Sequence, residues 1–351
     1  MEEEADSSIL AIDLGGTQIR AAHVRPDLTV SHRAAVATDD EAGVAAVVRR
    51  ICELVAEVRA DARAAGAPDP IGIGISAPGP LDPWRGIVVA PPNLTAWRNV
   101  PLARIVEERI GLPTFLERDT NVAVQCEWRY GAARGANTAI YFTISTGIGG
   151  GIILDGRPLL GRDGTAGEVG HLTVELDGPI CGDGQRGHVE AIASGTAIAR
   201  SAREALDDGR APGLAALVRD GAAPDAATVA RAADEGDTTC AAILDRAWEA
   251  LGAMAASVVN ALNPDVIVLG GGIAANRPEV LERVRRGIEQ RAFPAPAARV
   301  RVALAEHGDD VSLIGSLPIV HDRIHDPAFR RATPVRATAT GAATSQRSSM
   351  P

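Results

Sequence analysis

Short apolar runs and longer helical stripes follow one another along this chain. Apolar runs of strand length cover residues 9–12, 19–24, 71–75, 114–116, 139–144, 152–154 and 265–269. Apolar positions spaced three and four apart, or Ala-rich stretches, predict helices over residues 41–65, 102–110, 120–130, 225–262, 278–291 and 310–321. This alternation of strands and helices predicts an α/β fold in which helices cover the sheets.

One pattern occurs twice. Residues 9–24 read as strand, glycine turn and strand around DLGGTQ (13–18), and residues 139–154 repeat this around STGIGGG (145–151). The repetition predicts an internal duplication that gives two similar α/β lobes facing each other. We expect a smaller lobe from residues 1–118 with about 308–323, a larger lobe from 119–307, and a disordered tail over 324–351, which is rich in Ala, Thr, Ser, Pro and Arg.

The charged residues of the chain exclude some partners and some kinds of catalysis. The chain carries 35 basic and 45 acidic residues, a formal net charge of −10, and its aromatic content is 3%. Nucleic acid is therefore not the expected partner. All 35 basic residues are arginine, which excludes a P-loop lysine, a protein-kinase lysine and any lysine nucleophile. The chemistry has to use carboxylates, hydroxyls, imidazoles, backbone amides or bound metal.

The spacing of the cysteines and the length of the apolar runs indicate in which cellular compartment we expect the protein. Cys52, Cys126, Cys181 and Cys240 lie far apart without a C-x-x-C pair, which is typical of a reducing compartment. No apolar run reaches the roughly 18 residues of a membrane span, and the N-terminus is acidic and polar. We expect a cytoplasmic protein with no membrane partner.

Three glycine-rich turns follow apolar strands, at residues 13–18, 145–151 and 270–276. Consecutive amides in such turns bind anions. The third turn, after a buried strand, suits an adenine and ribose, and Asp13 suits Mg²⁺. One such turn is usually only a hairpin, but three together indicate nucleotide phosphates. The candidate nucleotide residues are Asp13, Gly15, Gly16, Thr17, Thr146, Gly147, Gly149, Gly271 and Gly272. Without a Walker lysine, the remaining architecture is the two-hairpin clamp of the actin-like sugar kinases, with the active site between the lobes.

Several carboxylates are candidates to bind the sugar that would accept the phosphate. Asp119 follows the strand at 114–116 and could take a proton from a sugar hydroxyl, although Asp is also a favoured helix cap. The candidates for hydrogen bonds to sugar hydroxyls are Glu168, Glu190 and Asn93, although Asn93 could simply form a hydrogen bond within its own turn.

Together these residues identify a family. The chain resembles the repressor, open reading frame, kinase (ROK) group, which includes bacterial glucokinases and N-acetylmannosamine and N-acetylglucosamine kinases. The resemblance covers residues 9–320 and is carried by DLGGTQIR (13–20), APGPLD (77–82), PPNLTAW (91–97), ERDTNVA (117–123), STGIGGG (145–151), AGEVGH (166–171), GDGQRGHVEAIASG (182–195) and VIVLGGGI (266–273).

The resemblance implies roles and a function. Asp119 matches the catalytic base; Asn93, Glu168, His171 and Glu190 match sugar contacts, with Gly79 in the same shell. It implies a homodimeric, ATP- and Mg²⁺-dependent kinase acting on the 6-hydroxyl of glucose. The alternatives are an N-acetylmannosamine, N-acetylglucosamine or other hexose kinase, or a catalytically weak sugar sensor. The family's DNA-binding members carry a helix-turn-helix before the first glycine motif, and here only eight polar residues precede the first strand, which disfavours a repressor.

Three positions depart from the family pattern. Arg118 stands where Asn is usual, and we expect it to donate to a sugar hydroxyl. Gln18 replaces the usual lysine of the first turn. The zinc motif keeps its spacing but has Asp183 and His188 in place of two cysteines, so the predicted ligands of a structural Zn²⁺ are His171, Cys181, Asp183 and His188.

Overall fold

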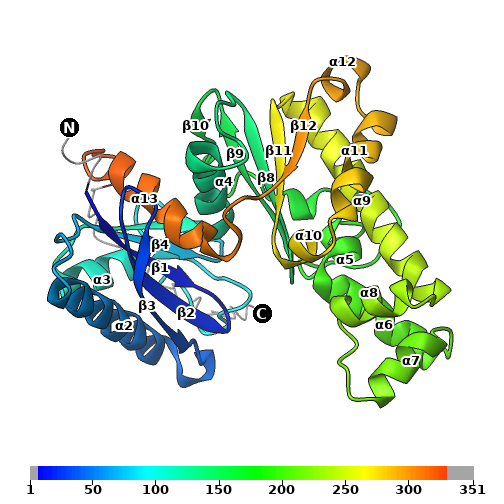
Figure 1. The fold of residues 1–351 in the computed structure, drawn as a ribbon, viewed down its shortest axis with the longest axis horizontal. Coiled ribbons are helices and arrows are strands. Elements are labelled where there is room, and N and C mark those ends of the chain that lie inside the picture. The colour runs from blue at the N-terminus through cyan, green and yellow to red at the C-terminus, as the bar shows by residue number, and fades with distance from the viewer. Residues whose placement is uncertain (1–6, 330–351) are drawn as a thin grey trace, which may run out of the picture.

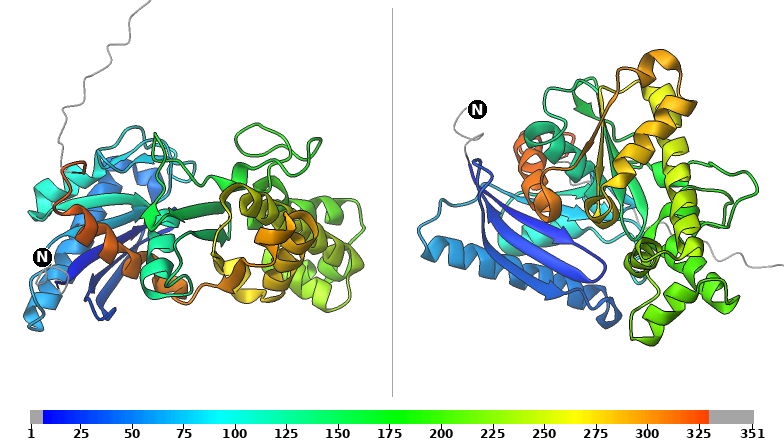
Figure 2. Two further views of the ribbon diagram at one scale, coloured as in Figure 1. Left: turned by 90° about the horizontal axis from the view of Figure 1, so that it is seen from above. Right: turned by 45° about the vertical axis from the view of Figure 1, so that its right-hand side comes forward.

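The computed structural model describes residues 7–329, which form two α/β lobes side by side (Figures 1 and 2). Across these residues the strands make two five-stranded sheets, one in each lobe, and a two-stranded ribbon of β5 (Leu81–Asp82) and β6 (Ile87–Val88). The predicted two-lobed α/β architecture is confirmed.

The sheet of the first lobe has the order β3-β2-β1-β4-β7. Its strands are β1 (Ile9–Leu14), β2 (Gln18–Val24), β3 (Val30–Ala37), β4 (Ile73–Ala77) and β7 (Thr114–Arg118). β2 is antiparallel to both β1 and β3, whereas β4 is parallel to β1 and β7. Every residue of β4 and β7 is buried, as expected of parallel strands covered on both faces.

The sheet of the second lobe repeats this topology, in the order β10-β9-β8-β11-β12. Its strands are β8 (Ala139–Ile144), β9 (Ile148–Leu154), β10 (Arg157–Pro158), β11 (Val266–Gly270) and β12 (Arg301–Leu304). β9 is antiparallel to β8 and β10, and β11 is parallel to β8 and β12. The same succession of antiparallel and parallel pairs in both lobes confirms the predicted duplication.

Helices cover both faces of each sheet. In the first lobe, α2 (Val44–Ala64) and α3 (Leu102–Ile110) cover one face and α13 (Val311–Arg323) covers the other. In the second lobe, α4 (Asp119–Tyr130) covers one face. The remaining helices build the core on the opposite side: α5 (Glu190–Ala193), α6 (Gly195–Asp207), α7 (Pro212–Arg219), α8 (Ala226–Asp234), α9 (Thr238–Leu262), α10 (Gly272–Asn276), α11 (Glu279–Arg291) and α12 (Pro294–Ala297).

Two helices connect the lobes. α4 contacts β4 and β7 of the first sheet and β8 and β9 of the second, and it packs along α13 (Figure 1). The chain reaches α13 from β12, so the C-terminal helix returns to the first sheet after the second lobe is complete. The residue that starts α4 therefore lies where the lobes meet.

Some element boundaries differ from the sequence predictions. Several elements were not predicted: the strands β3, β5, β6, β10 and β12 and the helices α5, α6, α7, α10 and α12. The helical segment predicted over residues 225–262 is two helices, α8 and α9, and short 3₁₀ turns precede α2 and α13 (Asp40–Ala42, Gly308–Asp310). The chain stays packed through Phe329, beyond the expected start of the tail at residue 324, while the rest of that predicted tail lies outside the described residues. Among residues 7–329, no helix combines the length and hydropathy that a membrane crossing requires.

Candidate active site

Asp119 begins α4 directly after β7. It is not the helix cap, which is Arg118; instead, its Oδ1 accepts the Thr120 N–H at 2.7 Å. The residue is exposed at the surface, but the surrounding protein displaces much of the water near its carboxylate, and this desolvation raises its pKa from 3.8 to about 6. The Thr120 N–H and the charge of Arg118 oppose the rise, whereas Asp13 and Glu168 add to it. Such a carboxylate is suited to accept a proton near neutral pH.

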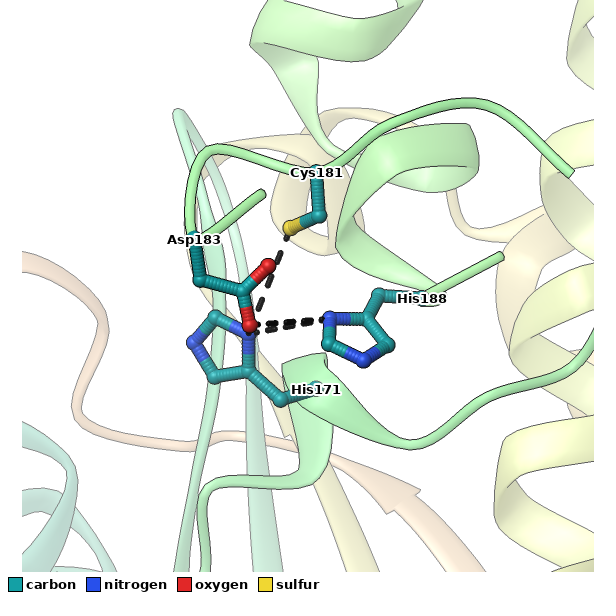
Figure 3. A group of neighbouring side chains, drawn as sticks. All are labelled: His171, Cys181, Asp183 and His188. Carbon is teal, nitrogen blue, oxygen red and sulfur yellow. Dashed lines mark hydrogen bonds and ion pairs between the residues drawn. The ribbon is translucent and has the colours of Figure 1, made fainter. Parts of the chain in front are cut away.

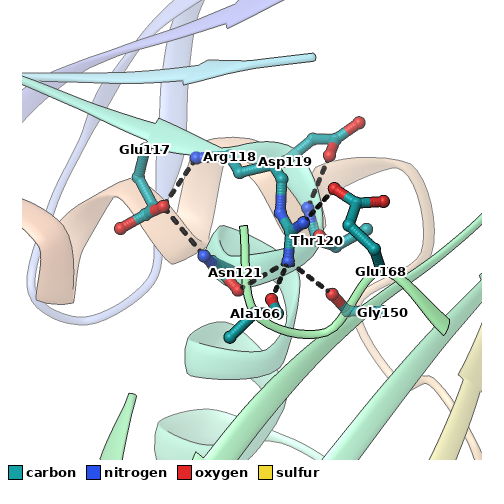
Figure 4. Close-up of polar contacts among 8 residues, drawn as sticks. All are labelled: Glu117, Arg118, Asp119, Thr120, Asn121, Gly150, Ala166 and Glu168. Atoms are coloured by element: carbon teal, nitrogen blue, oxygen red, sulfur yellow. Dashed lines mark hydrogen bonds and ion pairs between the residues drawn. The ribbon is translucent and has the colours of Figure 1, made fainter. Parts of the chain in front are cut away.

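Arg118 is buried, with 4% of its side chain exposed, and its guanidinium faces protein groups (Figure 4). Its Nη1 forms an ion pair with Glu168, and its Nη2 donates to the Gly150 carbonyl at 2.8 Å and to the Ala166 carbonyl. The expectation that Arg118 donates to a sugar hydroxyl therefore does not fit its position, because its terminal nitrogens are already bonded within the protein.

Glu168 lies on the segment that leads into a 3₁₀ turn at Val169–His171. Arg118 binds its Oε1, while 40% of the side chain is exposed. The segment lies against β9, because Gly167 has a φ of +89° and a side chain there would meet the Gly150 carbonyl at 2.7 Å. Glu168 therefore has one carboxylate oxygen held and one free to bind a ligand.

The first glycine turn connects β1 and β2. It is closed by the Gly15 N–H, which donates to the Gln18 carbonyl at 2.9 Å. Gly16 and Thr17 are exposed at its tip, and a Cβ on Gly16 would lie 3.1 Å from the Cβ of Asn93. The turn and the Asn93 loop, two predicted binding elements, are thus in contact.

Two residues near this turn were missed by the sequence analysis. Arg20 donates twice to Oδ2 of Asp13, at 2.6 and 3.0 Å, which leaves Oδ1 of Asp13 for a cation or its water. Asp40 holds the Asn93 loop by accepting the Thr95 N–H and the indole N–H of Trp97. Asp13 and Arg20 are opposite each other in the β1–β2 hairpin, so the register of the predicted hairpin was the signal that could have found this pair. The sequence gives no signal for the contacts of Asp40, because its partners come from a separate segment.

The second glycine turn is shorter than predicted. β9 begins at Ile148, so Gly149, Gly150 and Gly151 lie in a strand paired with β8. A Cβ on Gly149 would lie 2.9 Å from the Thr120 side chain, and one on Gly151 would lie 2.2 Å from the Thr120 carbonyl. These glycines allow α4 to approach the sheet. Gly149 therefore lies in β9 and not in the turn, and its assignment to nucleotide binding stays a prediction.

The Glu190 carboxylate contacts the shortened second turn, residues 145–147, and the residue that follows it. Its Oε2 accepts the Ile148 N–H at 2.8 Å and lies 2.7 Å from where a Cβ on Gly147 would be. Thr146 presents its carbonyl to Thr196 at the start of α6. A residue predicted to grip sugar thus contacts a turn predicted to bind phosphate.

The third glycine turn follows β11. Gly271 has a φ of +86°, and a Cβ there would lie 2.6 Å from the Ile144 carbonyl, so glycine is required. Thr146 and Gly272 both line a cavity of about 870 Å³ that extends between α6, α8 and α10. Trp248 and Ile273 contribute apolar walls. A cavity of this size, bordered by two glycine turns, suits a nucleoside.

We call residues 171–188 the metal loop. Four of its side chains point toward one another (Figure 3). The Nδ1 atoms of His171 and His188 are 3.3 Å apart, and each lies 3.3 Å from Oδ2 of Asp183. Cys181 Sγ lies 4.0 Å from Nδ1 of His171. Tetrahedral zinc with bonds of about 2.0–2.3 Å separates its ligands by roughly 3.3–3.8 Å. The distances among His171, His188 and Asp183 match this range, and the Cys181 sulfur lies slightly beyond it.

The altered zinc motif has a second interpretation from the sequence: a motif that has lost its metal and is held by hydrogen bonds, with Asp183 bridging to an arginine such as Arg186. The contacts do not match it. Arg186 donates to the Gly178 carbonyl, not to Asp183. Asp183 instead accepts the Gln185 N–H, and that hydrogen bond, followed by the nearby His188 and His171, holds the pKa of its carboxyl below the usual range. The Asp183 carboxylate is therefore ionised and free of arginine.

Comparison with known proteins places these features in context. The model of the ROK family matches residues 9–323. A glucokinase of Thermotoga maritima is 34% identical over 316 residues, 90% of this chain and 98% of the relative. The crystal structure of a ROK hexokinase from Thermus thermophilus has a TM-score of 0.76 at 33% identity, covering 91% and 99% of the two chains. A ROK family glucokinase from Streptomyces griseus, solved with glucose and AMPPNP, has a TM-score of 0.75 at 31% identity, covering 88% and 98%.

Proposed function

This chain belongs to the ROK family, and from that premise we propose that it is an ATP- and Mg²⁺-dependent hexose kinase that phosphorylates the 6-hydroxyl of glucose. The glucokinase relatives support glucose as the acceptor. The observation that carries the proposal is the Asp119 carboxylate, which has a raised pKa and starts the helix that joins the lobes.

The sugar is proposed to bind beside Asp119. Glu168 offers its free carboxylate oxygen, and Asn93, Glu190 and His171 offer further polar groups. Carboxylates and amides accept and donate in the spacing that adjacent sugar hydroxyls need. Gly79, beside Arg118, keeps the wall of this site free of a side chain.

Asp119 is proposed to be the general base. It accepts the proton of the attacking hydroxyl as the oxygen approaches the γ-phosphate. Its single described hydrogen bond, from the Thr120 N–H to Oδ1, leaves Oδ2 for that proton. Closure of the lobes excludes water and orients the two substrates, which supplies the remaining acceleration.

The nucleotide is proposed to lie along the glycine turns. The amides of residues 16–17 and 146–147 face the phosphates, because those of Gly15 and Ser145 are bonded within their turns. The cavity beside Thr146 and Gly272 receives the adenosine. Magnesium, when bound, supplies positive charge to the phosphates. Oδ1 of Asp13 is the group available for the ion or its water, because Arg20 occupies Oδ2.

The metal loop is proposed to hold a structural Zn²⁺ through His171, Cys181, Asp183 and His188, since their ligand atoms all lie within 4.8 Å of one another. Zinc supplies a cross-link there and no step of the reaction. The loop connects the segment of Glu168 to the start of α5 at Glu190. The ion would thereby fix two of the sugar-binding carboxylates.

A panel of hexoses with ATP and Mg²⁺, followed by ADP release, tests the proposal. Turnover with glucose well above that with mannose, fructose and the N-acetylated amino sugars is the expected result. Preference for an amino sugar would move the assignment to the amino-sugar kinases. Tight sugar binding without ADP release would indicate the sugar sensor instead.

Two further attributes are part of the proposal. All four cysteines are free thiols, which supports a reducing compartment such as the cytoplasm. The family resemblance supports a homodimer, which light scattering on the purified chain tests directly.

A further inference from the structure

The geometry around Arg118 points to a role that the reaction alone does not assign. We propose that Arg118 is a positioning residue: it fixes the Glu168 carboxylate for sugar binding and ties the Glu168 segment to the strand that carries Asp119. This inference rests on the proposed function, because it takes Glu168 as a sugar-binding group.

The contacts of Arg118 cross from one lobe to the other. Its backbone belongs to β7 in the first sheet. Its guanidinium bonds the Gly150 carbonyl on β9, the Ala166 carbonyl and the Glu168 carboxylate, all in the second lobe (Figure 4). A longer contact of 3.4 Å reaches Oδ1 of Asn121 on α4. A planar fork with several donors can serve these four acceptors at once, whereas a lysine ammonium cannot match that geometry.

The burial of Arg118 makes these contacts obligatory. Only 4% of the side chain is exposed, and its Nε has no hydrogen-bond partner. Arginine cannot give up its proton in a protein, so its charge needs a counterion. Within residues 7–329, Glu168 is the one carboxylate that it pairs with. Glu168 is therefore held in place by the need to neutralise Arg118.

The stem of Arg118 is also confined. A Cβ on Gly79 would lie 3.0 Å from its Cδ and 3.5 Å from its Cγ. Glycine at residue 79 thus leaves the room that the arginine stem occupies. This contact with Arg118 accounts for glycine at residue 79.

Fixing Glu168 in advance lowers the cost of binding sugar. One carboxylate oxygen is held by Arg118 and the other is free, so the free oxygen has a defined direction before the sugar arrives. A side chain that is already ordered loses less conformational entropy on binding.

Arg118 also acts on the base. The charged groups that act on Asp119 are Arg118, which favours its ionised form, and Asp13 and Glu168, which oppose it. Removing the positive charge of Arg118 should therefore shift the acidic limb of the activity profile to higher pH.

Two substitutions separate the contact from the charge. Arg118→Gln removes both, and Arg118→Lys keeps the charge but not the fork. We expect both to raise the sugar KM roughly tenfold or more, the scale of one charge-assisted hydrogen bond, while the ATP KM stays near that of the wild type. Only Arg118→Gln should shift the acidic limb upward. Arg104→Gln, which alters an exposed pair with Glu108, is the control and should change neither.

Combining Arg118→Gln with Glu168→Gln tests whether the two act together. The double variant should have a sugar KM close to that of the weaker-binding single variant, since both changes break one contact. The inference would be overturned if the double variant raised the sugar KM by the product of the two single effects. It would also be overturned if both Arg118 variants kept the wild-type sugar KM, or if they raised the sugar and ATP KM equally. These results leave the proposed function standing if the wild type phosphorylates hexoses; a wild type that phosphorylates none overturns both.

Discussion

The site carboxylates differ in how they are held. Oδ2 of Asp13 is bound by Arg20, and Oε1 of Glu168 by Arg118, each at an ion pair. Glu190 accepts the Ile148 N–H. Asp119 receives one backbone hydrogen bond and no ion pair within the described part of the chain. Desolvation raises the pKa of Asp119 to about 6, so this carboxylate is suited to take up a proton near neutral pH.

The raised pKa of Asp119 predicts how activity depends on pH. The base must be ionised, and its pKa is about 6. kcat/KM should therefore be nearly constant above pH 7 and fall about tenfold for each pH unit well below 6. A pH profile with glucose measures this limb. A kcat/KM that stays flat down to pH 4.5 would remove Asp119 as the base.

Sequence reasoning reached Asp119 and not the role of Arg118, for a physical reason. Asp119 stands at a strand-to-helix junction inside a recognisable motif, so its neighbours along the chain are informative. The partners of Arg118 lie at residues 150, 166 and 168. Only the packing of one lobe on the other brings them together, and no local pattern records it.

At the scale of elements, the central strands of both sheets and the longest helices were predicted from periodicity, whereas α6, α7, β3 and β12 were not, and the glycine-rich β9 was predicted only in part. β9 carries three consecutive glycines, which local preference assigns to a turn. In the structure they pair with β8 as a strand, and α4 passes so close to β9 that residue 151 has no room for a Cβ. β3 was missed because five of its eight residues are only partly buried and its apolar alternation is weak.

The metal loop gives a second prediction. Purified protein should contain about one zinc per chain, and its removal by a chelator should weaken sugar binding, because the loop joins Glu168 to Glu190. Elemental analysis and sugar titration before and after chelation measure this. With a single thiolate, the site should lose zinc more readily than a three-cysteine site.

Cys181→Ser and Cys52→Ser form a matched pair for this loop. Both thiols are buried and free, but only Cys181 lies among the predicted ligands. The Cys181 variant should lose zinc and the Cys52 variant should keep it. Metal-free wild-type protein with full affinity for sugar would show that the loop does not depend on the ion.

At the scale of the molecule, the architecture follows from two passages of the chain between the lobes. The chain leaves the first lobe through α4 and returns from β12 to α13. We propose residues 1–118 with 308–323 and residues 119–307 as the two domains, supported by the packing of α13 on the first sheet. The duplication could be predicted from the repeated hairpin pattern. The contact of α4 with both sheets could not, since it depends on how the lobes dock.

The return of α13 is secured by a buried ion pair, which gives a third prediction. Arg323 and Glu117 pair with 5% and 0% of their side chains exposed, and Arg323 also donates to the Leu116 carbonyl at 3.0 Å. Arg323→Met leaves Glu117 charged and unpaired in the core. Unfolding free energy should fall by about 3–5 kcal/mol, measured by urea denaturation. Arg129→Met removes an exposed pair with Asp322 and should cost under about 1 kcal/mol. Equal losses in both variants would contradict this account.

The central claim is that Asp119 takes the proton of the sugar hydroxyl. Replacing Asp119 by Asn preserves the shape of the side chain and removes its ability to accept that proton. The most direct measurement is kcat with glucose, ATP and Mg²⁺ for Asp119→Asn, together with the glucose dissociation constant and the unfolding free energy at pH 7. We predict a kcat about 10²–10⁴ lower with nearly unchanged glucose affinity. Stability should be equal or higher, because the folded pKa of Asp119 lies above its ordinary value and ionisation between pH 4 and 6 destabilises the fold. A variant that retains the wild-type kcat would contradict the account.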